Sequence, residues 1–110
     1  MKQYTIDELR FADYETLKKY LDENFSDSSF DSVYWIPLIP DILNPVQKEH
    51  IDCQPFYFAA ELFEDRLVCE LLLRTKSRLR CECIGYADRK QLNWIIDSVD
   101  SIFERLEIII

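Results

Sequence analysis

The chain has 110 residues, the size of one domain with one modest core, and twenty-one acidic residues against thirteen basic ones give it a net charge of −8. That charge disfavours nucleic acid and anionic membranes as partners. Gly85 is the only glycine, which excludes the glycine-rich loops that hold nucleotides, so we expect no cofactor. We expect a single α+β domain over residues 1–110.

The start of the chain carries no predicted targeting signal. No apolar run follows Lys2, so a secretory signal peptide is not expected, and no stretch is long enough to cross a bilayer. The predicted location is the cytoplasm, where the four cysteines are expected as reduced thiols.

A first helix is predicted over residues 13–24. Asp13 is a suitable N-cap, and three apolar residues at helical spacing form the stripe expected to be buried: Tyr14, Leu17 and Leu21. Thr5, with Glu8 three residues later, is an alternative capping box. The apolar phase breaks before Tyr14, so the two turns are kept separate.

Polar residues at 26–29 predict a loop, and a strand is predicted at about 33–36. Pro37 restricts this strand to an edge of the sheet or ends it. The segment from there to residue 55 contains all four prolines and is predicted as surface connection. Within it, Asn44-Pro45-Val46-Gln47 has the N-cap pattern of a short helix.

An antiparallel meander of three strands is predicted, at about 56–63, 66–74 and 78–86. The first two are joined by Glu64-Asp65, a two-residue hairpin loop. This loop places Ala60 opposite Cys69 and Phe56 opposite Leu73.

The register of the second hairpin follows from the match of apolar residues. A three-residue loop at 75–77 sets Leu71 opposite Cys81 and Cys69 opposite Cys83, whereas a two-residue loop would set Leu71 opposite Glu82. A slip of one residue moves every side chain to the other face, so the apolar match favours the first register. One face of the meander is then wholly apolar and is predicted to be the core.

The last helix is predicted over residues 88–106, with Asp88 and Gln91 as reciprocal caps. Its apolar stripe should lie on the apolar face of the sheet and comprises Leu92, Ile95, Ile96, Val99, Ile102, Phe103 and Leu106. With the helix at 13–24 on the same face, the predicted fold is a two-layer α+β sandwich. Residues 107–110 are too apolar to be free in water, and we expect them to dock as an edge strand or across a dimer interface.

The cysteines allow two interpretations. His50, Cys53, Cys81 and Cys83 could hold a metal ion as thiolates and an imidazole, but on a strand the C-x-C spacing is flat and does not turn the chain around an ion. Buried cysteine commonly acts as a small apolar core residue, and this interpretation is favoured. A Cys69–Cys83 disulfide is disfavoured by the compartment. A His50–Cys53 catalytic pair lacks any local sign of an orienting group or oxyanion donors.

The outer face of the meander has the composition of a contact surface. In the predicted register Tyr57, Leu72, Arg74, Arg78 and Arg80 share this face, and arginine mixed with aromatic and aliphatic residues is typical of protein interfaces. The alternative is a solvated face whose charges protect the hairpin tip.

Trp94 is a second candidate contact residue. On the helix at 88–106 it points away from the stripe centred near Val99, among polar residues. A tryptophan there is either covered by another part of the chain, for example Tyr4 and Ile6, or binds a partner.

These features predict a non-enzymatic protein-interaction module, an acidic adaptor or chaperone-like protein that forms a homodimer or binds another protein. The rival hypothesis is a small Cys/His metal-binding or thiol-dependent accessory protein that uses His50, Cys53, Cys81 and Cys83. Nothing in the sequence argues for or against a ligand pocket between sheet and helices. No motif in the sequence identifies a known family.

Overall fold

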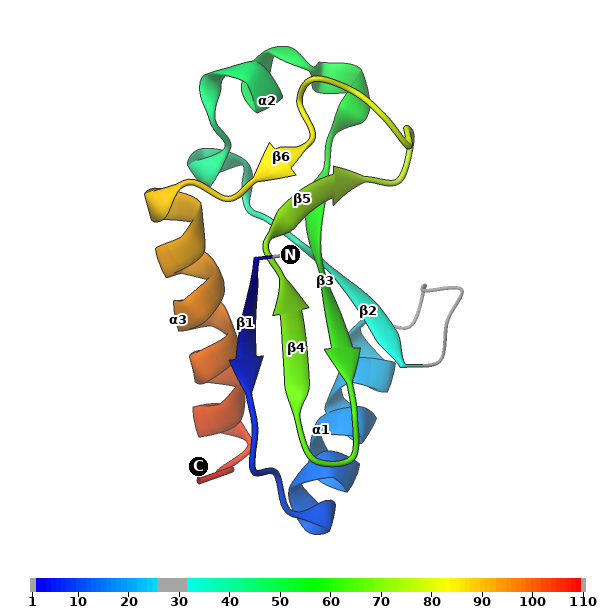
Figure 1. Ribbon diagram of the computed structural model, residues 1–110, viewed down its shortest axis with the longest axis vertical. Helices are drawn as coiled ribbons and strands as arrows, with labels where there is room; N and C mark the ends of the chain where they lie inside the picture. The colour runs from blue at the N-terminus through cyan, green and yellow to red at the C-terminus, as the bar shows by residue number, and fades with distance from the viewer. Residues whose placement is uncertain (1, 26–31, 110) are drawn as a thin grey trace.

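The computed structural model describes residues 2–25 and 32–109, which form an antiparallel sheet with helices packed against one face (Figure 1). The predicted two-layer α+β arrangement is confirmed. The loop predicted at 26–29 lies outside the described residues. Within the described ranges, no helix combines the length and apolar character needed to cross a membrane.

The helices and strands are bounded as follows. In chain order they are β1 (Gln3–Ile6), α1 (Phe11–Asn24), β2 (Val33–Pro37), η1 (Pro40–Ile42), α2 (Pro45–Glu49), η2 (Ile51–Cys53), β3 (Phe56–Leu62), β4 (Leu67–Glu70), β5 (Leu72–Thr75), β6 (Gly85–Tyr86) and α3 (Arg89–Arg105). The elements labelled η are short 3₁₀ turns.

Strand β3 is the centre of the sheet. On one side it pairs with β2. On the other side its first residues, Phe56 and Tyr57, pair with β5, and its last residues, 60–62, pair with β4. Strand β1 adds to the outer side of β4, and β6 adds to the outer side of β5. As predicted, β2 is an edge strand that ends at Pro37.

The predicted register of the first hairpin is confirmed near its loop and is wrong beyond Leu71. Ala60 pairs with Cys69, as expected, but Phe56 pairs with Thr75 instead of Leu73. Leu71 causes the shift because it leaves the ladder with β3. Its N–H donates to the carbonyl of Lys2, and its own carbonyl accepts from the N–H of Ala87.

The predicted strand at 78–86 is wrong except for its last two residues. Only β6 pairs there, with Gly85 opposite Leu73. The edge position beside Cys69 is occupied by Tyr4 of β1 instead of Cys83. Strand β1 is not among the predicted elements, although the alternation of Tyr4 and Ile6 with polar residues has the period of a strand. Residues 76–84 therefore form a long loop between β5 and β6.

The helix predictions differ little from the structure. Helix α1 starts at Phe11, two residues before the expected start, and Asp13 is its third residue instead of its N-cap. The Asp13 carboxylate accepts from the N–H of Arg10 at 3.2 Å, which still satisfies the helix start. Helices α2 and α3 begin with the predicted capping boxes, Asn44 with Gln47 and Asp88 with Gln91.

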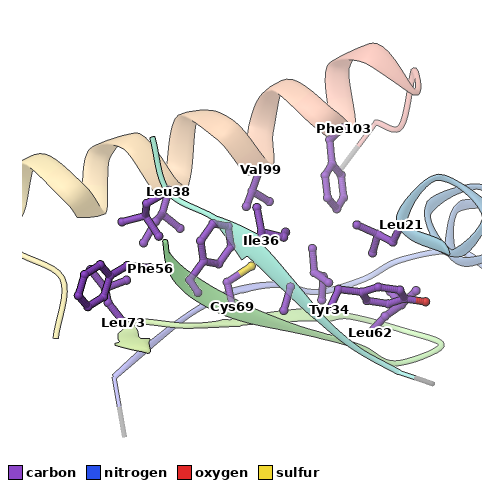
Figure 2. Packing of buried hydrophobic residues seen from close by; sticks show 14 of the residues in the cluster. Leu21, Tyr34, Ile36, Leu38, Phe56, Leu62, Cys69, Leu73, Val99 and Phe103 are labelled. Atoms are coloured by element: carbon purple, nitrogen blue, oxygen red, sulfur yellow. The ribbon is translucent and has the colours of Figure 1, made fainter. Parts of the chain in front are cut away.

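The core lies between the inner face of the sheet and helices α1 and α3 (Figure 2). Phe56 and Phe58 are fully buried in it, and each such side chain contributes roughly 1.5–3 kcal/mol by its removal from water. Helix α3 faces them with Ile95, Val99 and Phe103. At the end of the chain Ile108 docks into the same core, and its N–H donates to the carbonyl of Phe103. No strand is assigned at 107–109, which corrects the expected edge strand.

Two buried glutamines link α2 to α3. The amide of Gln91 donates to Oε1 of Gln47 at 2.7 Å and to the carbonyl of Ile42 at 3.1 Å. Gln47 Oε1 also accepts from the N–H of Asn44, so the side chain that closes the cap of α2 is fixed by α3. Through this contact the segment that follows α2 is held against the helix.

Gln91→Leu is expected to lower the free energy of unfolding by about 2–3 kcal/mol, because it leaves the carbonyl of Ile42 without its side-chain donor, removes one of the two donors to Gln47 Oε1 and removes the acceptor of the Asp88 N–H. Urea denaturation measures the loss. Gln54→Ala is the matched control: its amide bonds two backbone carbonyls at longer distances and is half-exposed, so the loss should stay below about 1 kcal/mol. Equal losses in the two variants would show that the contact between α2 and α3 is not stabilising.

Candidate metal centre

Four metal-ligating side chains from two distant segments meet at one end of the sheet. They are His50, which precedes η2, Cys53, which is the last residue of η2, and Cys81 and Cys83 in the loop between β5 and β6. One ligand atom from each side chain lies within 4.8 Å of the others. Figure 1 shows the two segments side by side, the yellow loop passing beside the green segment that follows α2.

The first pair is placed by the end of α2. His50 caps this helix, and its N–H donates to the carbonyls of Val46 and Gln47. The chain then turns once, and the N–H of Cys53 donates to the carbonyl of His50 at 3.0 Å. This turn brings the two side chains together, with Cys53 buried and His50 half-exposed.

The second pair also lies on a turn. The N–H of Ile84 donates to the carbonyl of Cys81 at 3.0 Å, and the backbone N–H of Cys83 donates to the Cys81 sulfur. The premise that Cys81 and Cys83 lie on a flat strand is therefore wrong. The backbone of the C-x-C segment turns at Cys81, so that both thiols can face one point.

Side-chain hydrogen bonds link the start of the loop to η2. The hydroxyl of Thr75 donates to the carbonyl of Cys53, and the hydroxyl of Ser77 donates to the carbonyl of Asp52 at 3.3 Å. Thr75 is buried. The loop is thus fastened at its beginning by these bonds and at its end by the pairing of β6.

The imidazole of His50 is oriented by two neighbours. Its Nδ1 lies 3.2 Å from the sulfur of Cys81, and its Nε2 lies 3.4 Å from the carboxylate of Glu82. Nδ1 therefore points into the cluster, and Nε2 points towards the carboxylate of Glu82. A carboxylate behind a histidine ligand fixes the tautomer and orientation of the ring. Glu82 is not among the residues predicted from the sequence, although it lies between two of the candidate ligands, Cys81 and Cys83.

Glu82→Gln is expected to weaken zinc affinity about fivefold, less than the 10–100-fold typical of such outer partners, because the Glu82 side chain is 81% exposed. Competition with a chromogenic chelator measures the dissociation constant. Glu61→Gln, which also neutralises an exposed glutamate but lies on β3 outside the cluster, is the control and should leave the constant unchanged. An equal effect of both substitutions would mean that only net charge matters and that Glu82 does not orient His50.

The pKa values of the thiols differ according to their surroundings. Hydrogen bonds from the backbone N–H and then the thiol of Cys83 lower the pKa of Cys81 to about 7, and the His50 ring contributes less. Burial raises the pKa of Cys83 to about 12, and the neighbouring sulfurs add to this shift. The cluster alone thus favours one thiolate, whereas a bound cation would stabilise all three.

The donor set fits a zinc ion. Three thiolates and one imidazole form the Cys₃His set of structural zinc sites. With Zn–S and Zn–N bonds of about 2.3 and 2.0 Å, tetrahedral ligand atoms lie about 3.5–3.8 Å apart. Separations of up to 4.8 Å exceed these values by about 1 Å at most. An open hollow of about 620 Å³ beside the site is lined by Arg78 and Asp52, among others.

The other predicted site residues lie elsewhere. Tyr57, Leu72 and Arg74 are half-exposed on β3 and β5, whereas Arg78 and Arg80 are exposed in the loop and pair with no strand. The prediction that Arg78 and Arg80 share a sheet face with Arg74 is therefore wrong. Arg74 instead bonds Glu70 at 2.6 Å.

Trp94 is half-buried, and the edge of its ring packs against Phe58 of the core at a centroid distance of 6.3 Å. The core itself therefore covers part of the ring, and Tyr4 and Ile6 pack against the same core. A role for Trp94 in partner binding stays a prediction.

Comparison of the chain with models of protein families, with curated proteins and with solved structures finds no match. The functional argument therefore depends on the site alone.

Proposed function

We propose that this protein is a small zinc-binding domain in which the metal has a structural, non-enzymatic role. The observation that carries the proposal is the convergence of His50, Cys53, Cys81 and Cys83, whose ligand atoms lie within 4.8 Å of one another. These residues come from segments almost thirty positions apart in the chain.

The number of ligands supports a structural role. Four protein ligands complete the tetrahedral shell of zinc, whereas catalytic zinc sites keep a position for water or substrate. The role that follows for the metal is to fasten residues 76–84, which have no regular structure, against η2. The site requires reduced thiols, in agreement with the cytoplasmic location that we propose.

The test is the metal content of the native protein. Protein purified without chelator and without added metal should carry one Zn²⁺ per chain by elemental analysis, and native mass spectrometry should show the corresponding mass. The three ligand thiols should become titratable on chelation, whereas the thiol of Cys69, buried in the core, should require denaturation. Metal-free protein with a rigid, protected loop at 76–84 would contradict the proposal.

A second function is supported by a separate observation, the exposure of Leu79 to 96% in the same loop. We propose on this ground that the domain is also a protein-interaction module, as an adaptor or chaperone-like protein would be. A large apolar side chain held in water favours contact with another protein surface. Light scattering of the zinc-loaded protein distinguishes a homodimer from a module for a different partner.

A further inference from the structure

The loop between β5 and β6 gathers positive charge on an acidic protein. Residues 74–80 contain Arg74, Lys76, Arg78 and Arg80 and no acidic residue, whereas the whole chain has a net charge of −8. Arg74 is paired with Glu70. Among the described residues, Arg78 and Arg80 are placed against no carboxylate, and both are exposed.

An apolar groove lies beside these charges on the outer face of the sheet. Its volume is about 280 Å³, and its walls include Trp35 of β2 and Ala59 of β3. Leu79 and Ile84 of the loop form another part of the wall. The rings of Trp35 and Tyr57 pack edge to face, with their centroids 5.8 Å apart, and this contact holds Trp35 in place. Leu79 is thus the apolar side chain that joins the groove to the basic loop.

The metal site and the groove share one short piece of chain. Arg78 lines both the hollow beside the cysteines and the groove beside Trp35. Only Arg80 separates Leu79 from Cys81, a span of about 7 Å of extended chain. Metal coordination at Cys81 and the hydrogen bond of Thr75 would therefore hold both ends of the segment 76–80. Fixing the segment before binding reduces the entropy lost on binding.

We propose that the segment 76–80 and the adjacent groove, here named the basic-groove surface, bind a segment of another protein that carries carboxylates next to apolar side chains. The proposal rests on the proposed zinc function, because the metal holds the loop in position. Carboxylates of the partner would pair with Arg78 and Arg80, whose guanidinium groups can each donate two parallel N–H hydrogen bonds to a carboxylate. An apolar side chain would enter the groove beside Leu79 and Trp35.

Charge complementarity selects this occupant over the alternatives. A second copy of the chain carries the same charge of −8, so two copies repel at long range. A nucleic acid extends a long run of phosphates over the acidic remainder of the surface, whereas a short acidic segment meets mainly the basic residues of 76–80, and phosphates gain nothing from the apolar part of the groove. An acidic and apolar protein segment matches both halves of the surface.

The test uses defined polymers and zinc-loaded protein. A fluorescent random copolymer of glutamate and tyrosine should bind, as measured by anisotropy, at least about tenfold more tightly than polyglutamate. A copolymer of lysine and tyrosine should not bind. Equal binding of polyglutamate, or tighter binding of a single-stranded DNA oligonucleotide, would overturn the proposal. A dimer in light scattering that disappears in Leu79→Asp would overturn it in favour of self-association.

Variants locate the binding. Leu79→Asp, and separately Arg78→Glu combined with Arg80→Glu, should each weaken binding of the glutamate–tyrosine copolymer at least about tenfold while one zinc remains bound. Lys19→Glu is the matched control: it reverses the charge of an exposed lysine on α1 and should change the affinity less than about twofold. Unchanged binding in the loop variants would overturn the proposal.

Zinc content, measured on the same samples, separates the two proposals. Zinc-loaded protein that fails to bind the copolymer overturns the basic-groove surface and leaves the zinc site intact. Protein that carries no zinc, yet binds the copolymer through Leu79 and Arg78, supports the surface and contradicts the zinc site. Chelation of loaded protein should weaken copolymer binding about tenfold, because the segment 76–80 then loses one of its two anchors.

Discussion

Cys53→Ala is expected to lower the affinity for Zn²⁺ by more than about 100-fold, the largest effect of any single substitution that we predict. Removal of an outer partner of a zinc ligand already costs 10–100-fold, and Cys53 is proposed as a direct ligand. Cys81→Ala and Cys83→Ala should have effects of the same size. Competition with a chromogenic chelator gives the dissociation constants, and elemental analysis gives the zinc content after gel filtration.

Cys69→Ala is the matched control, because Cys69 is the one cysteine outside the cluster. Its side chain is fully buried in the core opposite Ala60, and burial raises the pKa of its thiol to about 12. Its loss should cost about 1 kcal/mol of stability through the cavity and leave zinc affinity unchanged. If all four cysteine variants bound zinc equally, or if Cys69→Ala alone released it, the assignment of the site would be wrong.

The sequence predicted those elements whose signals are local. Helix α3 follows from seven apolar residues at helical spacing and from the capping pair of Asp88 and Gln91. The hairpin of β3 and β4 follows from the two-residue loop between them. These features depend on contacts near in sequence, for which the period of the apolar pattern and the turn chemistry carry most of the information.

The rest depends on competition between distant segments. Two segments have an apolar alternation that could pair with β4, namely β1 and the loop at 76–84. The alternation pattern alone therefore could not decide which of them pairs beside Cys69. Because β1 pairs with β4, Cys81 and Cys83 lie in a loop outside the sheet. The set of four candidate ligands was visible in the sequence, and what was missing was the turn at Cys81 that lets the C-x-C spacing surround an ion.

Removal of zinc is expected to expose the loop without dissolving the core. With free zinc about 1,000-fold above its dissociation constant, binding stabilises the folded chain by about 4 kcal/mol. Chelation should therefore lower the melting temperature by about 15 °C or more for a domain of this size. The far-ultraviolet circular dichroism should change little at 25 °C, because strands β1 to β4 are paired with one another and packed against α3 independently of the loop at 76–84.

Trypsin reports the local part of this change. Lys76, Arg78 and Arg80 give the protease three cleavage sites between the anchors at Thr75 and Cys81. Cleavage there should be at least about tenfold faster in chelator than in zinc, because a protease needs a segment that can leave its bound conformation. Cleavage after Lys19 in α1 is the internal control and should keep its rate. Readdition of Zn²⁺ should restore protection, whereas equal rates at Arg78 and Arg80 with and without metal would mean that the loop owes its position to the sheet and to Thr75 alone.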